Sequence, residues 1–149
     1  MAASQYITFN IMEHLIGINI KDVREINRIL DITPVQHALD YVKGLINLRG
    51  NTVTVFDLAV RLGFEHRVIT DESHNIILKK DDVGLLVDNI GDVVEAADDD
   101  IELPPANLKG IRSSFIQGVK KLDTELLVIL SAQKIIEYDV AYKEKDKDN

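Results

Sequence analysis

The stretch that decides the fold is YVKGLINLRGNTVTVFDLAVRLG, residues Tyr41–Gly63. It reads as two apolar strand segments around a short polar turn, followed by a helical pattern, and the turn holds the charged Arg49. The same plan recurs later without a gap, because Tyr41–Leu62 aligns with Phe115–Ile136, FIQGVKKLDTELLVILSAQKII. The sequence therefore contains a second copy of its own pattern.

Another motif recurs ahead of this one, and in the same order. GINIKDVREI, residues Gly17–Ile26, aligns with GLLVDNIGDV, residues Gly84–Val93, and this alignment sets Glu25 against Asp92. Each copy reads as two strands around a tight turn, a third strand, then strand, turn, strand and a short amphipathic helix. Five short strands suit a small barrel better than an open sheet, whose edges would stay unpaired. We therefore predict an all-β fold with short helices, made of two five-stranded barrels from an internal duplication.

The length suits one domain better than two independent ones. The chain has 149 residues, and pieces of half this length bury little apolar surface on their own. We expect a single domain over residues 5–138, built of two copies at about 5–66 and 74–138, with the two barrels packed on each other. Residues 139–149 are charged and have little to bury, so we expect them to be disordered. Whether strands are exchanged between the barrels stays open.

Positions that keep the same chemical type in both copies are expected to serve the fold. Asp57 and Ser131 each stand just before a helical pattern, and both side chains are good N-cap acceptors for free backbone N–H groups. Asp57 is therefore predicted to cap a helix rather than to accept phosphate or act as a general base. Gly63 suits the left-handed residue that follows the end of a helix.

Composition argues against several classes of function. Lys and Arg total 17 against 25 Asp and Glu, which gives a net charge of −8 without a basic stripe, so nucleic acid is not an expected partner. Cysteine is absent, which fits a reducing compartment. The sequence shows neither a signal peptide nor an apolar run long enough to span a membrane. We expect a cytoplasmic protein without direct membrane insertion.

Catalytic chemistry has little support in the sequence. The four histidines lack the i, i+4 spacing of a helical metal site, and there is no cysteine to join them. No glycine-rich phosphate loop or nucleophile elbow is present. The acidic run Asp98–Asp100 lacks the alternating ligands and central glycine of a calcium-binding loop. The prediction is a protein that is not an enzyme and that needs no metal or other cofactor.

The hairpin Asn47–Asn51 is where the first copy departs from the shared plan. Arg49 faces Asp123 in the second copy, so the barrel itself does not require an arginine there. A hairpin arginine is often an ordinary exposed residue that contributes little. Here, however, Glu25 lies in the third strand of the same copy, where its carboxylate can pair with the planar guanidinium at the rim of an apolar surface. The pair is a candidate binding site.

At these residues the sequence resembles a known family. GLINLRGNTVTVFDLAVRLG is similar to the signature of the CheW family of bacterial chemotaxis adaptors, close to G-[VI]-[IT]-N-L-R-G-x-[VI]-x-P-[VI]-x-[DN]-L. VREI at Val23–Ile26, DITPV at Asp31–Val35 and the GLLVDNIGDV motif also match in the right order. The resemblance covers about Gln5–Tyr138, and it departs at Thr54, where the family usually has proline. The sequence holds no ATPase or phosphotransfer region, which separates it from the related kinase CheA.

The resemblance implies two SH3-like five-stranded barrels with a third apolar core between them. It also implies an adaptor that couples the cytoplasmic hairpin of a chemoreceptor to a CheA-type histidine kinase. One barrel face would bind the regulatory domain of the kinase, and the region between the barrels would bind the receptor. Carried onto this chain, the residues expected to bind partners are Val23, Glu25, Ile26, Asn47, Leu48, Arg49 and Gly50.

Two other functions stay open from the sequence alone. A CheW-like adaptor can serve another kinase pathway, such as surface motility, and nothing in the sequence chooses between these pathways. Small barrels also host ligand binding and nucleic-acid binding. The low aromatic content, the absence of tryptophan and the net charge of −8 disfavour stacking on bases.

Overall fold

The computed structural model describes residues 2–105, 108 and 110–137. The tail predicted to be disordered, residues 139–149, lies outside the described residues. The strands are β1 (Ala3–Ile11), β2 (His14–Asn19), β3 (Val23–Asn27), β4 (Val42–Leu48), β5 (Asn51–Asp57), β6 (His74–Leu78), β7 (Val83–Val87), β8 (Val93–Ala97), β9 (Ile116–Lys121) and β10 (Leu126–Leu130). The α-helices are α1 (Leu58–Leu62) and α2 (Ala132–Ile136), and the 3-10 helices are η1 (Ile20–Asp22), η2 (Asp98–Asp100) and η3 (Ser113–Phe115).

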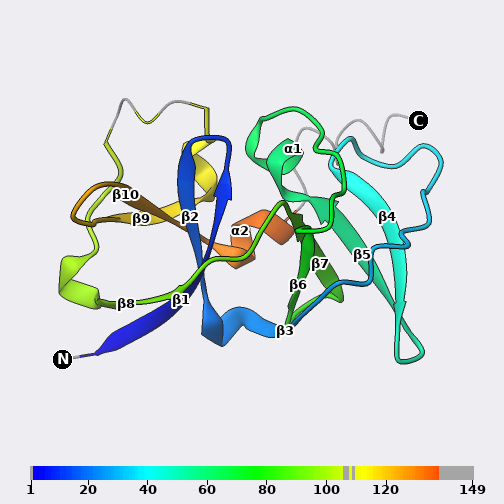
Figure 1. Cartoon of the computed structure of the whole chain (residues 1–149), viewed down its shortest axis with the longest axis horizontal. Helices are drawn as coiled ribbons and strands as arrows, with labels where there is room; N and C mark the ends of the chain where they lie inside the picture. Colours follow the sequence, from blue (N-terminus) through cyan, green and yellow to red (C-terminus); the bar gives the residue numbers. More distant parts are fainter. Residues whose placement is uncertain (1, 106–107, 109, 138–149) are drawn as a thin grey trace.

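The strands form two five-stranded sheets that lie side by side (Figure 1). Barrel 1 has the order β8-β1-β2-β10-β9, and barrel 2 has the order β3-β6-β7-β5-β4. An isolated bridge between Thr33 and Leu45 joins the chain after β3 to β4, and a bridge between Glu102 and Val119 joins the chain after β8 to β9. Each bridge brings the two edges of one sheet together, which leaves fewer unpaired edge groups. The prediction of two five-stranded barrels is confirmed.

Each barrel mixes strands from both copies of the sequence. Barrel 1 takes β1 and β2 from the first copy and β8, β9 and β10 from the second, whereas barrel 2 takes β3, β4 and β5 from the first copy and β6 and β7 from the second. Parallel pairs join the copies in the same register, with Ile129 opposite Gly17 in β10–β2 and Val55 opposite Gly84 in β5–β7. The sequence left this exchange open because alternation of apolar residues fixes the buried face of a strand but not its neighbour.

A matched pair of glycines allows the closure of the barrels. A Cβ at Gly44 would lie 2.2 Å from the carbonyl oxygen of Thr33, and a Cβ at Gly118 would lie 2.5 Å from Cγ2 of Ile101. Both distances are well inside van der Waals contact, so a residue without a side chain is needed where the chain crosses the strand. The glycine match between the two copies therefore follows from the way each barrel closes.

The largest apolar core lies between the barrels. Both sheets and both helices contribute to it, with Phe9 from barrel 1 and Phe56 from barrel 2 among its members. Smaller clusters lie on the other face of each sheet, around Leu127 in barrel 1 and Val55 in barrel 2. Because β7 is covered on both faces, every residue of its VGLLV sequence is buried. The third core implied by the family resemblance is present, and α2 lies between the barrels in Figure 1.

The helices begin at the residues that the comparison of the copies indicates. The Asp57 carboxylate accepts a hydrogen bond from the Val60 N–H at 3.4 Å, and the Ser131 hydroxyl accepts one from the Lys134 N–H at 3.3 Å. Gly63 follows α1 with a φ of 109°, in the left-handed region. The predicted caps are confirmed. Each α-helix has five residues, and within the described part of the chain no helix is long and apolar enough to cross a membrane.

Candidate functional site

The β4–β5 hairpin holds Arg49 in an unusual backbone conformation. Leu48 and Asn51 are paired, and the two residues between them, Arg49 and Gly50, have φ values of 50° and 87°. Two consecutive positive φ values are typical of a type I′ turn, which favours Asn-Gly. The Asn47 side chain supports the turn, because its Oδ1 accepts a hydrogen bond from the Gly50 N–H at 2.9 Å. A left-handed arginine costs on the order of 1 kcal/mol, so its presence points to a use other than turn formation.

Arg49 and Glu25 form an ion pair across the closure of barrel 2. The guanidinium Nη2 of Arg49 donates to Oε1 of Glu25. Glu25 lies on β3 and Arg49 follows β4, and these strands are the two edges of the sheet. The side chain of Arg49 is 71% exposed and that of Glu25 is 23% exposed. An exposed pair contributes about 0–1 kcal/mol to stability, so its main effect is to present a defined charge pattern to solvent.

A chain of side-chain amides continues from this pair into the core. Oε2 of Glu25 accepts a hydrogen bond from Nδ2 of Asn27 at 3.4 Å. Oδ1 of Asn27 in turn accepts from Nδ2 of the fully buried Asn75 at 3.3 Å and from the backbone N–H of Ile29 at 3.0 Å. Sequence reasoning missed both asparagines, although asparagine is depleted in strands and its place there was a usable signal. The network restricts the orientation of the Glu25 carboxylate.

The other predicted site residues surround the pair at different depths. Ile26 has an exposed apolar side chain, whereas Val23 packs at the edge of the central core. Asn47 and Gly50 are exposed at the turn. Leu48 is 4% exposed and packs in the smaller cluster of barrel 2. Its side chain supports the hairpin from within, so direct contact with a partner falls to the residues around it.

The described part of the second copy has no counterpart of this ion pair. The matching positions, Asp92 and Asp123, are both acidic, so they offer no cation to form such a pair. The β9–β10 turn is also longer than the β4–β5 turn. At the start of that turn, Nζ of Lys121 lies 3.8 Å from Oε2 of Glu102, with both side chains largely exposed. The paired charges on a tight turn are therefore a feature of barrel 2.

This arrangement suits recognition of another molecule. A planar guanidinium offers directional hydrogen bonds, and the oriented carboxylate and the exposed isoleucine beside it add a charge and an apolar contact. Such a surface can select a partner without a bound metal or cofactor. Two barrels that share a core and carry this surface define a binding module of the adaptor or scaffold class.

Comparison with known proteins identifies the family within this class. A family model described as a CheW-like domain matches residues 5–140, nearly the whole chain. The chain belongs to the CheW-like family. Its signature-like hairpin is the segment that holds Arg49 on the type I′ turn.

Named relatives agree with this assignment. The chain is 33% identical over 139 residues to the chemotaxis protein CheW of Treponema pallidum (strain Nichols), which covers 88% of this chain and 81% of that protein. It is also 33% identical to the chemotaxis protein CheW of Rhizobium meliloti (strain 1021), with 88% of this chain and 86% of the relative covered. The crystal structure of the scaffolding protein TtCheW from Thermoanaerobacter tengcongensis matches with a TM-score of 0.83 and 29% identity, over 93% of this chain and 91% of that chain. The SH3-like two-barrel fold expected from the sequence is confirmed.

Proposed function

We propose that this protein is a chemotaxis scaffold that joins the cytoplasmic hairpin of a chemoreceptor to the regulatory domain of a CheA-type histidine kinase. The observation that carries the proposal is the exposed Glu25–Arg49 pair, held on a turn whose geometry disfavours arginine. Membership of the CheW-like family, and relatives named as chemotaxis and scaffolding proteins, support the same role.

The proposed mechanism is assembly. Receptor and kinase bind different surfaces of one protein, so a conformational bias in one partner reaches the other through differences in contact free energy. The scaffold catalyses no reaction, needs no cofactor and works in the cytoplasm without inserting into the membrane or binding nucleic acid. Residues 5–138 act as a single domain of two copies, at about 5–66 and 74–138, and the large core between the barrels supports this proposal because it joins them.

The proposed partner-binding surface centres on the exposed guanidinium of Arg49. Glu25 fixes one side of the guanidinium, and the fork geometry leaves further N–H donors for a carboxylate or carbonyl of the partner. The full set of proposed partner-binding residues is Val23, Glu25, Ile26, Asn47, Leu48, Arg49 and Gly50, with Leu48 acting as buried support.

The test separates the charge of Arg49 from its effect on the turn. Arg49→Asn introduces a residue that favours a type I′ turn, so the free energy of unfolding should stay equal or rise by about 0.5–1 kcal/mol. The same change removes the guanidinium, and affinity for the kinase regulatory domain or the receptor hairpin should fall about tenfold, which is about 1.4 kcal/mol. Urea denaturation and calorimetric titration with each purified fragment measure the two effects.

Asp123→Asn is the matched control, because Asp123 occupies the equivalent position of the second hairpin. It should leave both affinities unchanged. Arg49→Lys should restore only part of the binding, since an ammonium group lacks the planar fork of a guanidinium. Wild-type affinity of Arg49→Asn for both partners would remove the ion pair from the binding surface.

A further inference from the structure

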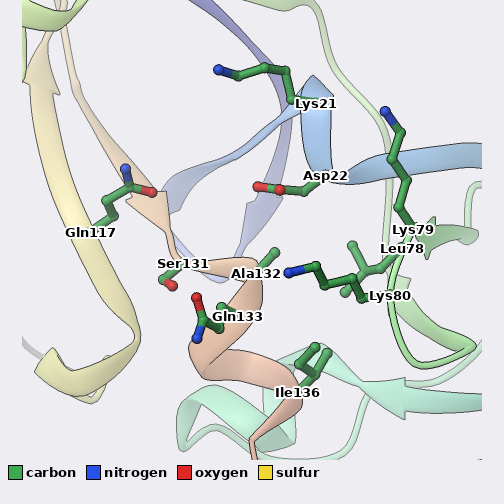
Figure 2. A pocket seen from close by; sticks show the side chains of 10 residues that line it. All are labelled: Lys21, Asp22, Leu78, Lys79, Lys80, Gln117, Ser131, Ala132, Gln133 and Ile136. Atoms are coloured by element: carbon green, nitrogen blue, oxygen red, sulfur yellow. The ribbon is translucent and has the colours of Figure 1, made fainter.

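Polar side chains meet at two places away from the exposed guanidinium of Arg49. One is a cleft of about 370 Å³ between the barrels, where Figure 2 shows three lysines extending in different directions. Amines that point apart create no common site for one ligand group. The other is the pair of amides, Asn27 and Asn75, in barrel 2, and hydrogen bonds fix the orientation of both. This pair, unlike the lysines, has a defined geometry.

The orientation of the Asn75 amide follows from its two partners. Asn75 lies in β6, directly opposite Asn27 in β3, and its side chain is fully buried. Its Nδ2 donates to the carbonyl oxygen of Ile29 at 2.7 Å and to Oδ1 of Asn27 at 3.3 Å. Both partners are acceptors, so turning the amide over would set its oxygen against two other oxygens. The NH2 group of Asn75 therefore has to face Asn27.

Asn27 passes this orientation on to the ion pair. Its Oδ1 accepts from Asn75 and also from the backbone N–H of Ile29 at 3.0 Å, so this oxygen has to face the interior. The NH2 group at the other end of the amide then faces Glu25 and donates to its Oε2 at 3.4 Å. Oε1 of Glu25 is left to accept from Nη2 of Arg49. The amide chain thus determines which carboxylate oxygen the guanidinium contacts.

This arrangement has a cost in stability. Among the described residues, Oδ1 of Asn75 has no hydrogen-bond partner, although the atom is buried. A buried acceptor without a donor destabilises a folded protein, and an apolar side chain in its place would avoid that cost. Such an unpaired group in a protein interior calls for an explanation other than stability. The orientation of Asn27 and Glu25 provides one.

The other barrel shows that the fold does not need these amides. The alignment of the two copies sets Thr8 against Asn75 and Val94 against Asn27. Thr8 is also buried, but its hydroxyl donates to the backbone carbonyl of Asp92 rather than to a side chain. Val94 has an apolar side chain that packs against the smaller cluster of barrel 1. The two amides are therefore an addition in the barrel that carries the ion pair.

We propose that Asn75, acting through Asn27, is a positioning residue for partner binding. It holds the carboxylate of Glu25 in one orientation, and Glu25 in turn holds the guanidinium of Arg49 in the geometry that a partner contacts. The side chain of Arg49 is 71% exposed, so packing restrains it little and the contact with Glu25 has to do so. The effect on binding rests on the proposed function, whereas the effect on the ion pair does not.

The first measurement needs no partner. It follows the order parameter of the Arg49 Nε–H group by 15N relaxation in the full chain. Asn75→Leu, which replaces the amide with an apolar group of the same branching, should lower this order parameter to the value in Glu25→Ala. Asn27→Val should do the same, and it introduces the residue of the other copy at a half-buried position, where repacking is easier. Thr8→Val, the matched control in barrel 1, should leave the order parameter unchanged.

The second measurement is calorimetric titration with the kinase regulatory domain and the receptor hairpin. Asn27→Val and Asn75→Leu should each weaken binding of the partner that contacts Arg49 by about fivefold. Because the amides act through the carboxylate, adding Asn27→Val to Glu25→Ala should weaken binding no further. A merely structural role of the amides would instead make the two losses additive.

Two outcomes would overturn the positioning role. One is an unchanged order parameter of Arg49 in both Asn75→Leu and Asn27→Val, which would show that Glu25 is held without the amides. The other is additive losses of affinity in the cycle with Glu25→Ala. A failure of the proposed function gives a different result, since the order parameter would then fall in both amide variants while Glu25→Ala kept wild-type affinity for both partners.

Discussion

The Asp57 carboxylate joins a helix cap to the loop that follows the helix. Its Oδ1 accepts from the Val60 N–H, and its Oδ2 accepts from the backbone N–H of Arg67 at 3.2 Å. The side chain is almost fully buried, so both oxygens depend on these donors. Ser131, at the matching position, has one side-chain oxygen and caps α2 through it. Asp57 and Ser131 therefore share the capping role, but Asp57 also holds the loop that follows its helix.

Asp57→Asn should destabilise the protein more than the capping role alone suggests. Asparagine still caps well, but it has one acceptor oxygen, and its NH2 group would face the N–H of Arg67. The free energy of unfolding should fall by about 1–3 kcal/mol, the cost of leaving a buried donor unsatisfied. Ser131→Ala, which removes only a cap, should cost about 1 kcal/mol. Equal losses in urea denaturation would show that the bond to Arg67 contributes nothing.

At the scale of elements, the two α-helices are tied by a buried arginine. Arg61 of α1 is 5% exposed, and its Nε donates to the carbonyl oxygen of Ile135 in α2 at 2.8 Å. Its Nη2 donates to the carbonyl oxygen of Glu137, just beyond α2. The guanidinium carbon lies 4.3 Å from the ring centre of Tyr41 and 4.7 Å from that of Phe115. One side chain thus satisfies carbonyls at the end of α2 while it packs between two aromatic rings.

Arg61→Met should separate the hydrogen bonds from the packing, because methionine fills a similar volume without donors. The free energy of unfolding should fall by about 2–4 kcal/mol, since the buried carbonyl of Ile135 and the part-buried carbonyl of Glu137 both lose a charged donor. Arg61→Lys should also be destabilised, because a single ammonium does not reproduce the fork. Lys134→Ala is the control, because it removes an exposed ion pair with Glu137 and should cost less than about 0.5 kcal/mol. A stable Arg61→Met variant would show that packing alone holds the helices.

These elements show which features of the structure the sequence predicts and which it does not. Strands and caps follow from local patterns, such as the alternation in β5 and the acceptors Asp57 and Ser131. The pairing of Glu25 with Arg49 also followed, because the two copies differ there. Arg61 was overlooked although the alignment sets it against Ile135, an apolar residue. The exchange of strands between the barrels could not be predicted, because apolar periodicity does not determine which strand pairs with which.

For the whole molecule, the exchange means that neither half of the chain holds a complete barrel. A cut between residues 72 and 73 separates β6 and β7 from the rest of barrel 2, and β1 and β2 from the rest of barrel 1. Residues 1–72 and 73–149 should each lack a cooperative thermal transition, because each would leave much of the central core exposed. Mixed in equal amounts, they should regain one, with a midpoint that rises with concentration.

Circular dichroism and calorimetry of the two fragments, alone and mixed, measure this directly. The same fragments with Phe56→Asp, which places a charge in the central core, serve as the control and should fail to reassociate. A cooperative transition in residues 1–72 alone would contradict the expectation, since it would mean that one copy can build its own barrel.

The order of strands also sets an order in time when the chain is made on a ribosome. Barrel 2 is one uninterrupted stretch from β3 to β7, so it can close before β8 emerges. The β1–β2 hairpin is made first but waits for β10, its neighbour in barrel 1, and at about 5–20 residues per second this delay is on the order of 10 s. Throughout that interval the side chains of Phe9 and Ile16 lack the completed core against which they pack in the folded protein. The β1–β2 hairpin thus waits longer for its sheet neighbour than any strand of barrel 2 does, and its apolar side chains stay open to aggregation for that time.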